Sequence, residues 1–160
     1  MSQKESRAKT LQERFGFVDS DLKTPRHDEI MIWLQANAEP ITDSIWKRGW
    51  HSPIDTYESI YHASIEWEYP ITNGQKFTIG FIDMRVECTA CLAPGRWVQR
   101  EFFFEVKSSI PSIGELMRQI NLYRLHKPQG YFIVVSPDES AKEVLRSQHI
   151  HFVKYDPERD

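Results

Sequence analysis

The spacing of apolar residues predicts one long helix near the start of the chain. Residues 26–39 place their apolar side chains on one helical face, at Ile30, Trp33, Leu34 and Ala38. Acidic residues in the first turn favour a helix start there, and Pro40 predicts its end. From about Thr56 the apolar residues alternate with polar ones, and this period of two is typical of strands.

Three strands are predicted in the middle of the chain. They cover residues 57–71, 75–88 and 97–107. The pair Asn73–Gly74 is a strong hairpin signal between the first two strands, and the stretch APGRW turns the chain before the third. The three strands are therefore expected to form an antiparallel meander.

Helices and strands alternate in the last third of the chain. A helix is predicted over 110–126, where Ser112 and Glu115 match a capping box. A continuous apolar strand, a short helix and a last edge strand follow, at 130–136, 137–148 and 149–156. A right-handed crossover should make the fourth strand parallel to the third. The predicted fold class is α/β, with a mixed central sheet flanked by helices and an extra C-terminal helix and strand.

Length and composition suit one domain with a polar extension. Residues 1–25 are expected to form an arm, helical in part, and residues 26–160 a single domain. The net charge of −3 argues against a protein that coats nucleic acid through overall positive charge, although it allows a local basic groove. Two cysteines and the lack of an apolar signal segment favour the cytoplasm. No run approaches the ~20 apolar residues of a membrane span, so no membrane partner is expected.

The candidate chemistry lies in the stretch EFFFEVK, residues 101–107. Residues two apart in a strand share a face, so Glu105 and Lys107 should project together. Asp83, on the neighbouring strand, could lie beside them. Two carboxylates next to a lysine suit a hard cation such as Mg²⁺, which can activate water and neutralise phosphate charge. The alternatives are a solvated Glu–Lys pair on an edge strand and an aspartate neutralised by Arg85.

These residues resemble the motif of the PD-(D/E)XK nuclease superfamily. That superfamily has an acidic residue on the second strand and acidic–any–Lys on the third, matched here by Asp83 and by Glu105-Val106-Lys107. The resemblance covers roughly residues 26–136 and implies an αβββαβ, restriction-endonuclease-like core. It also implies that Asp83, Glu105 and the Val106 carbonyl bind Mg²⁺ or Mn²⁺, with Lys107 as the catalytic lysine. Ile82 stands where the superfamily often has proline.

A second match resembles the RecB-like branch of that superfamily, whose next helix carries Gln-x-x-x-Tyr. Gln119 and Tyr123 have this spacing and share one helical face. The resemblance implies that Gln119 supports the active site and that Tyr123 helps to engage nucleic acid; an ordinary amphipathic helix is the alternative. Relatives carry His or Glu on the first helix, which makes His27 and Glu29 candidates for one further ligand. Two cysteines cannot supply the four-cysteine iron–sulfur cluster of some relatives.

Several aromatic and basic residues are candidates for contacting nucleic acid: Trp46, Lys47, Arg48, Trp50, Arg118 and Arg124. Aromatic rings stack on bases and cations contact phosphates. Arg96, Arg100 and Lys127 could extend this basic rim. The alternatives are tryptophans that fill the core and ordinary surface charges. Cys88 and Cys91 form a lone Cys-x-x-Cys, for which reduced thiols are favoured over half of a zinc site.

The sequence thus predicts a metal-dependent nuclease that hydrolyses phosphodiester bonds of nucleic acid, DNA rather than RNA. The alternative is a non-catalytic nucleic-acid- or protein-binding module on the same fold. Such a module would serve as a subunit or adaptor of a DNA-processing or mobile-element system. A homodimer is plausible, because cutting two strands often needs two sites.

Overall fold

The computed structural model describes residues 24–48, 59–93 and 95–158. The helices are α2 (Pro25–Arg48), α3 (Ile113–His126) and α4 (Lys142–Ser147). The strands are β1 (Ser59–Thr72), β2 (Thr78–Ala93), β3 (Arg96–Val106), β4 (Tyr131–Ser136) and β5 (His151–Lys154). The predicted arm over residues 1–25 lies outside this description except for its last two residues.

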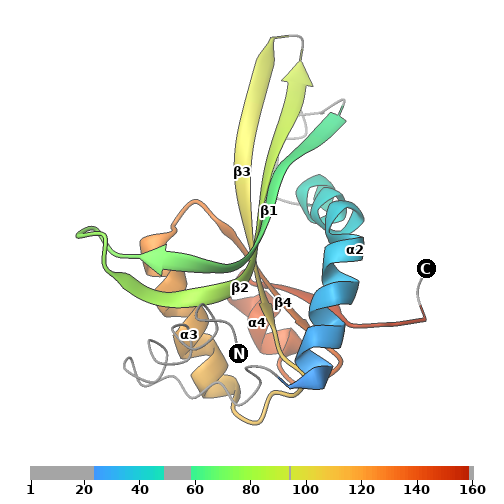
Figure 1. The fold of residues 1–160 in the computed structure, drawn as a ribbon, viewed down its shortest axis with the longest axis vertical. Coiled ribbons are helices and arrows are strands. Elements are labelled where there is room, and N and C mark those ends of the chain that lie inside the picture. The colour runs from blue at the N-terminus through green and yellow to red at the C-terminus, as the bar shows by residue number, and fades with distance from the viewer. Residues whose placement is uncertain (1–23, 49–58, 94, 159–160) are drawn as a thin grey trace.

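All five strands belong to one mixed sheet in the order β1-β2-β3-β4-β5 (Figure 1). The pairs β1–β2 and β2–β3 are antiparallel, whereas β3–β4 and β4–β5 are parallel. This confirms the predicted meander, the parallel fourth strand and the last edge strand. The fold is therefore α/β, and β3 is a central strand with a neighbour on each side.

Helices cover both faces of the sheet, as predicted. Ile30, Leu34 and Ala38 of α2 pack in one buried cluster with Phe102 and Phe104. A second cluster on the opposite face joins residues of α3 and α4 to Phe103 and to Val134 of β4. Figure 1 shows α2 running along one side of the sheet and α3 along the other. Among the described residues, no helix has the length and apolar character that crossing a bilayer requires.

Helix α2 begins and ends elsewhere than the sequence predicts. Its first turn is capped by Thr24, whose Oγ1 accepts a hydrogen bond from the amide of His27 at 3.1 Å. Pro25 takes the first helical position, where a missing N–H costs nothing. The prediction that Pro40 ends the helix is wrong, because the helix continues to Arg48. Thr42 and Ile45 are buried in this continuation, so tertiary packing outweighs the local cost of the exposed proline.

The hairpin signal at Asn73–Gly74 is confirmed, with a longer turn than two residues. The Asn73 carboxamide oxygen accepts hydrogen bonds from the amides of Gln75 and Phe77, both at 3.0 Å. Lys76 takes a left-handed backbone conformation with φ of 65°. The capping prediction for α3 is also confirmed, since Ser112 Oγ accepts from the amide of Glu115 at 3.2 Å.

Candidate active site

The candidate site lies where β2 separates from β3. Ladder pairing between these strands begins at Met84 opposite Phe104, and the part of β2 before Met84 pairs only with β1. Asp83 occupies this fork, and its Oδ2 accepts a hydrogen bond from the Val106 amide at 2.7 Å. The carboxylate therefore takes the place of a strand neighbour and lies beside the end of β3.

Glu105 and Lys107 lie together at the end of β3. The Lys107 Nζ is 3.2 Å from Glu105 Oε1, and Gln119 Nε2 on α3 donates to the same oxygen at 3.1 Å. Phe102, Phe104 and Val106 belong to the core on the opposite face. The predicted division of the strand into two faces is confirmed, and the alternative of a solvated pair on an edge strand is wrong. Glu105 is only 1% exposed.

The first helix contributes a histidine to this cluster. His27 Nε2 lies 3.3 Å from Asp83 Oδ1, and the His27 side chain is 8% exposed. Glu29, the other candidate, is 59% exposed and pairs with Arg26 at 3.3 Å. The structure therefore places His27, rather than Glu29, beside Asp83, and the position of Glu29 does not support its suggested role as a ligand.

The surroundings keep Asp83 ionised although it is buried. Burial alone would raise its pKa, but the charge of His27 and hydrogen bonds from His27 and the Val106 amide more than offset this. The positive charge of Lys107, which also pairs with Glu105, lowers the pKa of Asp83 further. The net effect is an Asp83 pKa below its ordinary value of 3.8.

Arg85 does not neutralise Asp83, contrary to the alternative reading of the sequence. Its guanidinium pairs with Glu101 at 2.7 Å, with Glu66 at 3.2 Å and with Glu87. Its carbon Cζ also lies 4.9 Å from the centre of the Tyr69 ring. The positive charge of Arg85 is therefore balanced by these three glutamates rather than by Asp83.

Gln119 and Tyr123 meet as the helical spacing predicts, but Tyr123 has a different role from the one the resemblance implies. Tyr123 is 0% exposed, so its ring cannot contact nucleic acid here. Its hydroxyl donates to the Phe81 carbonyl at 3.4 Å and lies 3.4 Å from Gln119 Nε2. A Cβ on Gly80 would lie 2.6 Å from the Tyr123 hydroxyl, so glycine leaves the space that this ring fills. Tyr123 therefore contacts Gln119 from within the core.

The loop after Lys107 is fastened by a residue that sequence reasoning missed. Asp138 accepts hydrogen bonds from the amides of Ile110 at 2.8 Å and Ser140 at 2.9 Å. The hydrogen bond from Ser140, followed by that from Ile110, holds its pKa below the ordinary value. The available signal was the turn sequence Ser-Pro-Asp-Glu-Ser after a buried strand, because aspartate commonly accepts from an amide two residues on.

The predicted nucleic-acid contacts are only partly present on the described surface. Trp46 is 1% exposed and packs against Phe102 with ring centres 5.9 Å apart, so its predicted stacking on bases is wrong and it fills the core. The side chains of Lys47 and Arg48, and all of Trp50, lie outside the described residues.

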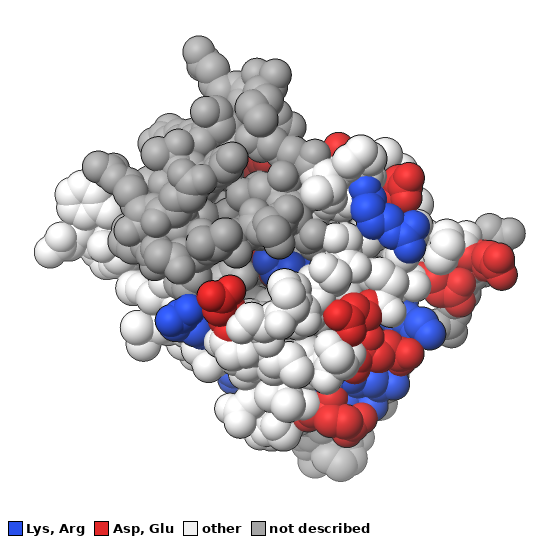
Figure 2. All heavy atoms as spheres, turned by 90° about the horizontal axis from the view of Figure 1, so that it is seen from below, with Lys and Arg blue, Asp and Glu red and all other residues white. Residues whose placement is uncertain are grey.

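Two arginines of the predicted basic rim have local partners in the structure. Arg118 is exposed, with its guanidinium 3.9 Å from Glu115. Arg124 donates to the Gln148 carbonyl at 2.9 Å. Figure 2 shows basic and acidic side chains of the described residues intermixed over the face that it presents.

The two cysteines are buried and form no disulfide. Burial, with smaller contributions from Glu39 and Glu87, raises the pKa of the Cys88 thiol to about 12, so this thiol stays protonated and unreactive. Within the described ranges, no three His, Cys, Asp or Glu residues gather closely enough to hold a metal ion. Any ion at Asp83 and Glu105 would therefore complete its coordination with main-chain, water or substrate oxygens.

Comparison with known proteins returned no match: no protein-family model, no curated protein and no solved structure is similar enough to identify this chain.

Proposed function

We propose that this protein is a metal-dependent nuclease that hydrolyses phosphodiester bonds of nucleic acid, with DNA as the expected substrate. The observation that carries the proposal is the meeting of Asp83, Glu105 and Lys107 around the end of β3. The order of helices and strands supports it, because it matches the αβββαβ core of the PD-(D/E)XK nuclease superfamily.

The donor set fits a hard divalent cation. Asp83 is held ionised, and Glu105 lies one strand position from the Val106 carbonyl. Mg²⁺ prefers oxygen ligands, needs few protein carboxylates and retains several waters. We assign Asp83, Glu105 and the Val106 carbonyl to such an ion, Mg²⁺ or Mn²⁺. When bound, it would activate a water molecule and neutralise negative charge on the phosphate.

The protein groups around the carboxylates each have a distinct task. Lys107 places a positive charge beside Glu105, where it can stabilise charge that develops on a phosphate in the transition state. Gln119 orients the Glu105 carboxylate through its hydrogen bond, and the Val106 amide orients Asp83. Asp83, Glu105, Lys107 and Gln119 are all buried, and their burial restricts the movement of these side chains. Catalytic groups need such restriction to keep a productive geometry.

The burial of the charged residues at the candidate site favours a second candidate function. Asp83 is 7% exposed and Lys107 is 9% exposed, and both are engaged with neighbouring groups. A charge network of this kind can also stabilise a fold that binds nucleic acid or protein without cutting. The protein would then act as a subunit or adaptor of a larger assembly.

Cleavage assays with wild type and Lys107→Ala separate the two functions. Circular, linear and single-stranded DNA, and an RNA of matched sequence, are incubated with Mg²⁺ or Mn²⁺. The nuclease proposal predicts cleavage that EDTA abolishes and that falls at least about 100-fold in Lys107→Ala. Lys142→Ala is the matched control, because Lys142, the first residue of α4, pairs with Glu139 of the preceding loop, away from the carboxylates. This substitution is expected to leave cleavage unchanged.

The nuclease assignment is wrong if wild type and Lys107→Ala behave alike on every substrate. Salt-dependent binding of nucleic acid without cleavage or metal uptake would select the binding module instead. Circular dichroism of each variant establishes that the fold is retained before activities are compared.

A further inference from the structure

A cavity of about 300 Å³ opens near the end of α3, at the opposite end of β4 from the candidate active site. It lies between the last turn of α3, the start of β4 and the connection from α4 to β5. Its lining includes Arg124, Lys127, Gly130, Tyr131, Phe132 and His149. No aspartate or glutamate of the described ranges lines it.

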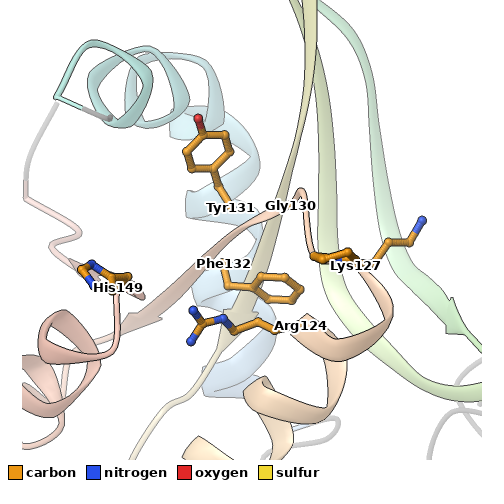
Figure 3. Close-up of a pocket in the computed structure, with 7 residues that line it drawn as sticks. Arg124, Lys127, Gly130, Tyr131, Phe132 and His149 are labelled. Carbon is orange, nitrogen blue, oxygen red and sulfur yellow. The ribbon is translucent and has the colours of Figure 1, made fainter. Parts of the chain in front are cut away.

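Arg124 is the cation that faces this cavity. Figure 3 shows its guanidinium directed toward His149, whereas the Lys127 ammonium points away. Lys127 Nζ instead lies 5.7 Å from the centre of the Tyr69 ring and 3.9 Å from Glu101. Lys127 therefore contributes mainly its aliphatic part to the lining.

The Arg124 guanidinium is fixed in place with donors to spare. Its Nη1 donates to the Gln148 carbonyl at 2.9 Å and to Asn121 Oδ1 at 3.4 Å. A guanidinium has five N–H donors, so Nε and Nη2 remain able to donate to an anion. Such a group, held at one edge, suits a planar or tetrahedral oxyanion and loses little side-chain freedom on binding.

His149 holds a backbone conformation that normally favours glycine. Its φ is 60°, and it follows α4 at the position where a left-handed residue closes the helix. The His149 amide donates to the Arg146 carbonyl at 3.0 Å, and the Ile150 amide donates to the Leu145 carbonyl at 2.9 Å. A histidine here costs roughly 1 kcal/mol of backbone strain that glycine would avoid. A functional role for its imidazole at the cavity would account for the choice of residue.

We propose that this cavity is a binding site for a phosphate group, with Arg124 as the principal ligand and His149 as a second donor. Free phosphate, a nucleotide and a nucleic-acid strand all present the same oxyanion chemistry to these groups. The site is separate from Asp83, Glu105 and Lys107, and it does not depend on the nuclease activity.

The test is an amide-resolved NMR titration of the full chain, in EDTA so that no divalent ion takes part. Inorganic phosphate is the first probe, followed by a nucleoside monophosphate and by single-stranded oligonucleotides with and without a 5′-phosphate. Saturable shifts are expected at Gly130, Tyr131 and His149. Arg124→Gln should weaken binding by about tenfold or more. Lys154→Gln removes one positive charge at the other end of β4, where Lys154 lies opposite Ser136 and pairs with Glu139 at 3.1 Å, and should change nothing.

A glycine variant separates binding from folding. His149→Gly should leave the melting temperature unchanged or raised, because strain is relieved, and should weaken phosphate binding. Binding of phosphate and nucleotide but not of an unphosphorylated oligonucleotide would identify a terminal phosphate as the ligand. Equal binding of that oligonucleotide would identify the nucleic-acid backbone. The proposal is overturned if no probe gives saturable shifts, or if Arg124→Gln binds as tightly as wild type.

Discussion

The Asp83 carboxylate accepts a hydrogen bond from the backbone amide of Val106 at 2.7 Å, across the point where β2 leaves β3. The Asp83 carboxylate therefore has two structural roles. It completes the hydrogen bonding of the central strand, and it lies beside the Glu105–Lys107 pair that the same strand presents. Folding and the proposed chemistry are consequently linked at Asp83, and variants of this residue should affect both.

Stability should depend on pH through Asp83. Its folded-state pKa lies below the ordinary value of 3.8, so its ionised form stabilises the fold at and above about pH 4. That stabilisation is lost as the pH falls through the folded-state pKa. At pH 7, Asp83→Asn should lower the free energy of unfolding by about 1–3 kcal/mol. Urea titrations of both proteins from pH 7 to pH 2.5 should show this difference shrinking below pH 4.

The exposed aspartate Asp156 provides the control for that experiment. Asp156→Asn should follow the wild-type pH dependence closely, because Asp156 is exposed and its hydrogen bond, at 3.2 Å, comes from the amide of Glu158, which is also exposed. A wild-type advantage over Asp83→Asn that stays constant down to pH 2.5 would contradict the account of the Asp83 pKa.

The absence of a side chain at Gly80 should be essential for the position of Gln119, because the Tyr123 ring that contacts Gln119 packs against Gly80. A Cβ at this position would lie 2.6 Å from the Tyr123 hydroxyl and 2.8 Å from Cε1, so Gly80→Ala must displace the ring. We expect a loss of about 1–3 kcal/mol in the free energy of unfolding. Cleavage should also fall, because Tyr123 holds Gln119 against Glu105.

Gly114→Ala is the matched variant for Gly80→Ala. Apart from its chain neighbours and the backbone of its own helix, no atom of the described residues lies within 4 Å of the Cβ that would be added to Gly114 in α3. Gly114 lies in the first turn of α3, where the cost of glycine is smaller than in a helix interior, so this substitution should raise the free energy of unfolding by no more than about 0.5 kcal/mol and leave cleavage unchanged. Equal effects of the two alanines in urea titrations would remove the steric argument.

Replacing the proline inside α2 should stabilise the protein. Pro40 is exposed within a continuous helix and cannot donate the helical hydrogen bond of an ordinary residue. Pro40→Ala should raise the free energy of unfolding by about 1–3 kcal/mol in urea titrations. Pro111→Ala, exposed outside the helices, should shift it by no more than about 0.5 kcal/mol. A destabilised Pro40→Ala would show that the proline rigidifies this turn favourably.

The order of helices and strands could be predicted because the apolar residues recur with a helical period in some segments and with a period of two in others. A continuous apolar run at Phe102–Phe104 requires burial on both sides, which makes β3 central and sends Glu105 and Lys107 to one face. These predictions depend on local spacing alone. Asp83 could be assigned to the neighbouring strand, whereas the register that brings it beside the end of β3 could not be fixed from the sequence and comes from the structure.

Other features depend on packing that no short stretch encodes. Trp46 lies in a segment rich in basic residues, yet Phe102 buries its ring, because α2 extends past Pro40 to carry it over the sheet. The choice between His27 and Glu29 follows from the rotation of α2 about its axis. That rotation is set by the buried face of the whole helix, with His27 turned inward and Glu29 outward.

Titration of Mn²⁺ into wild type and Asp83→Ala, followed by electron paramagnetic resonance, examines the metal site without knowledge of the substrate. Wild type should bind one Mn²⁺, and Asp83→Ala should bind it at least about tenfold more weakly, with Asp156→Ala unchanged. A wild-type protein that takes up no Mn²⁺, or an Asp83→Ala protein that binds it equally well, would contradict a metal centre at these carboxylates.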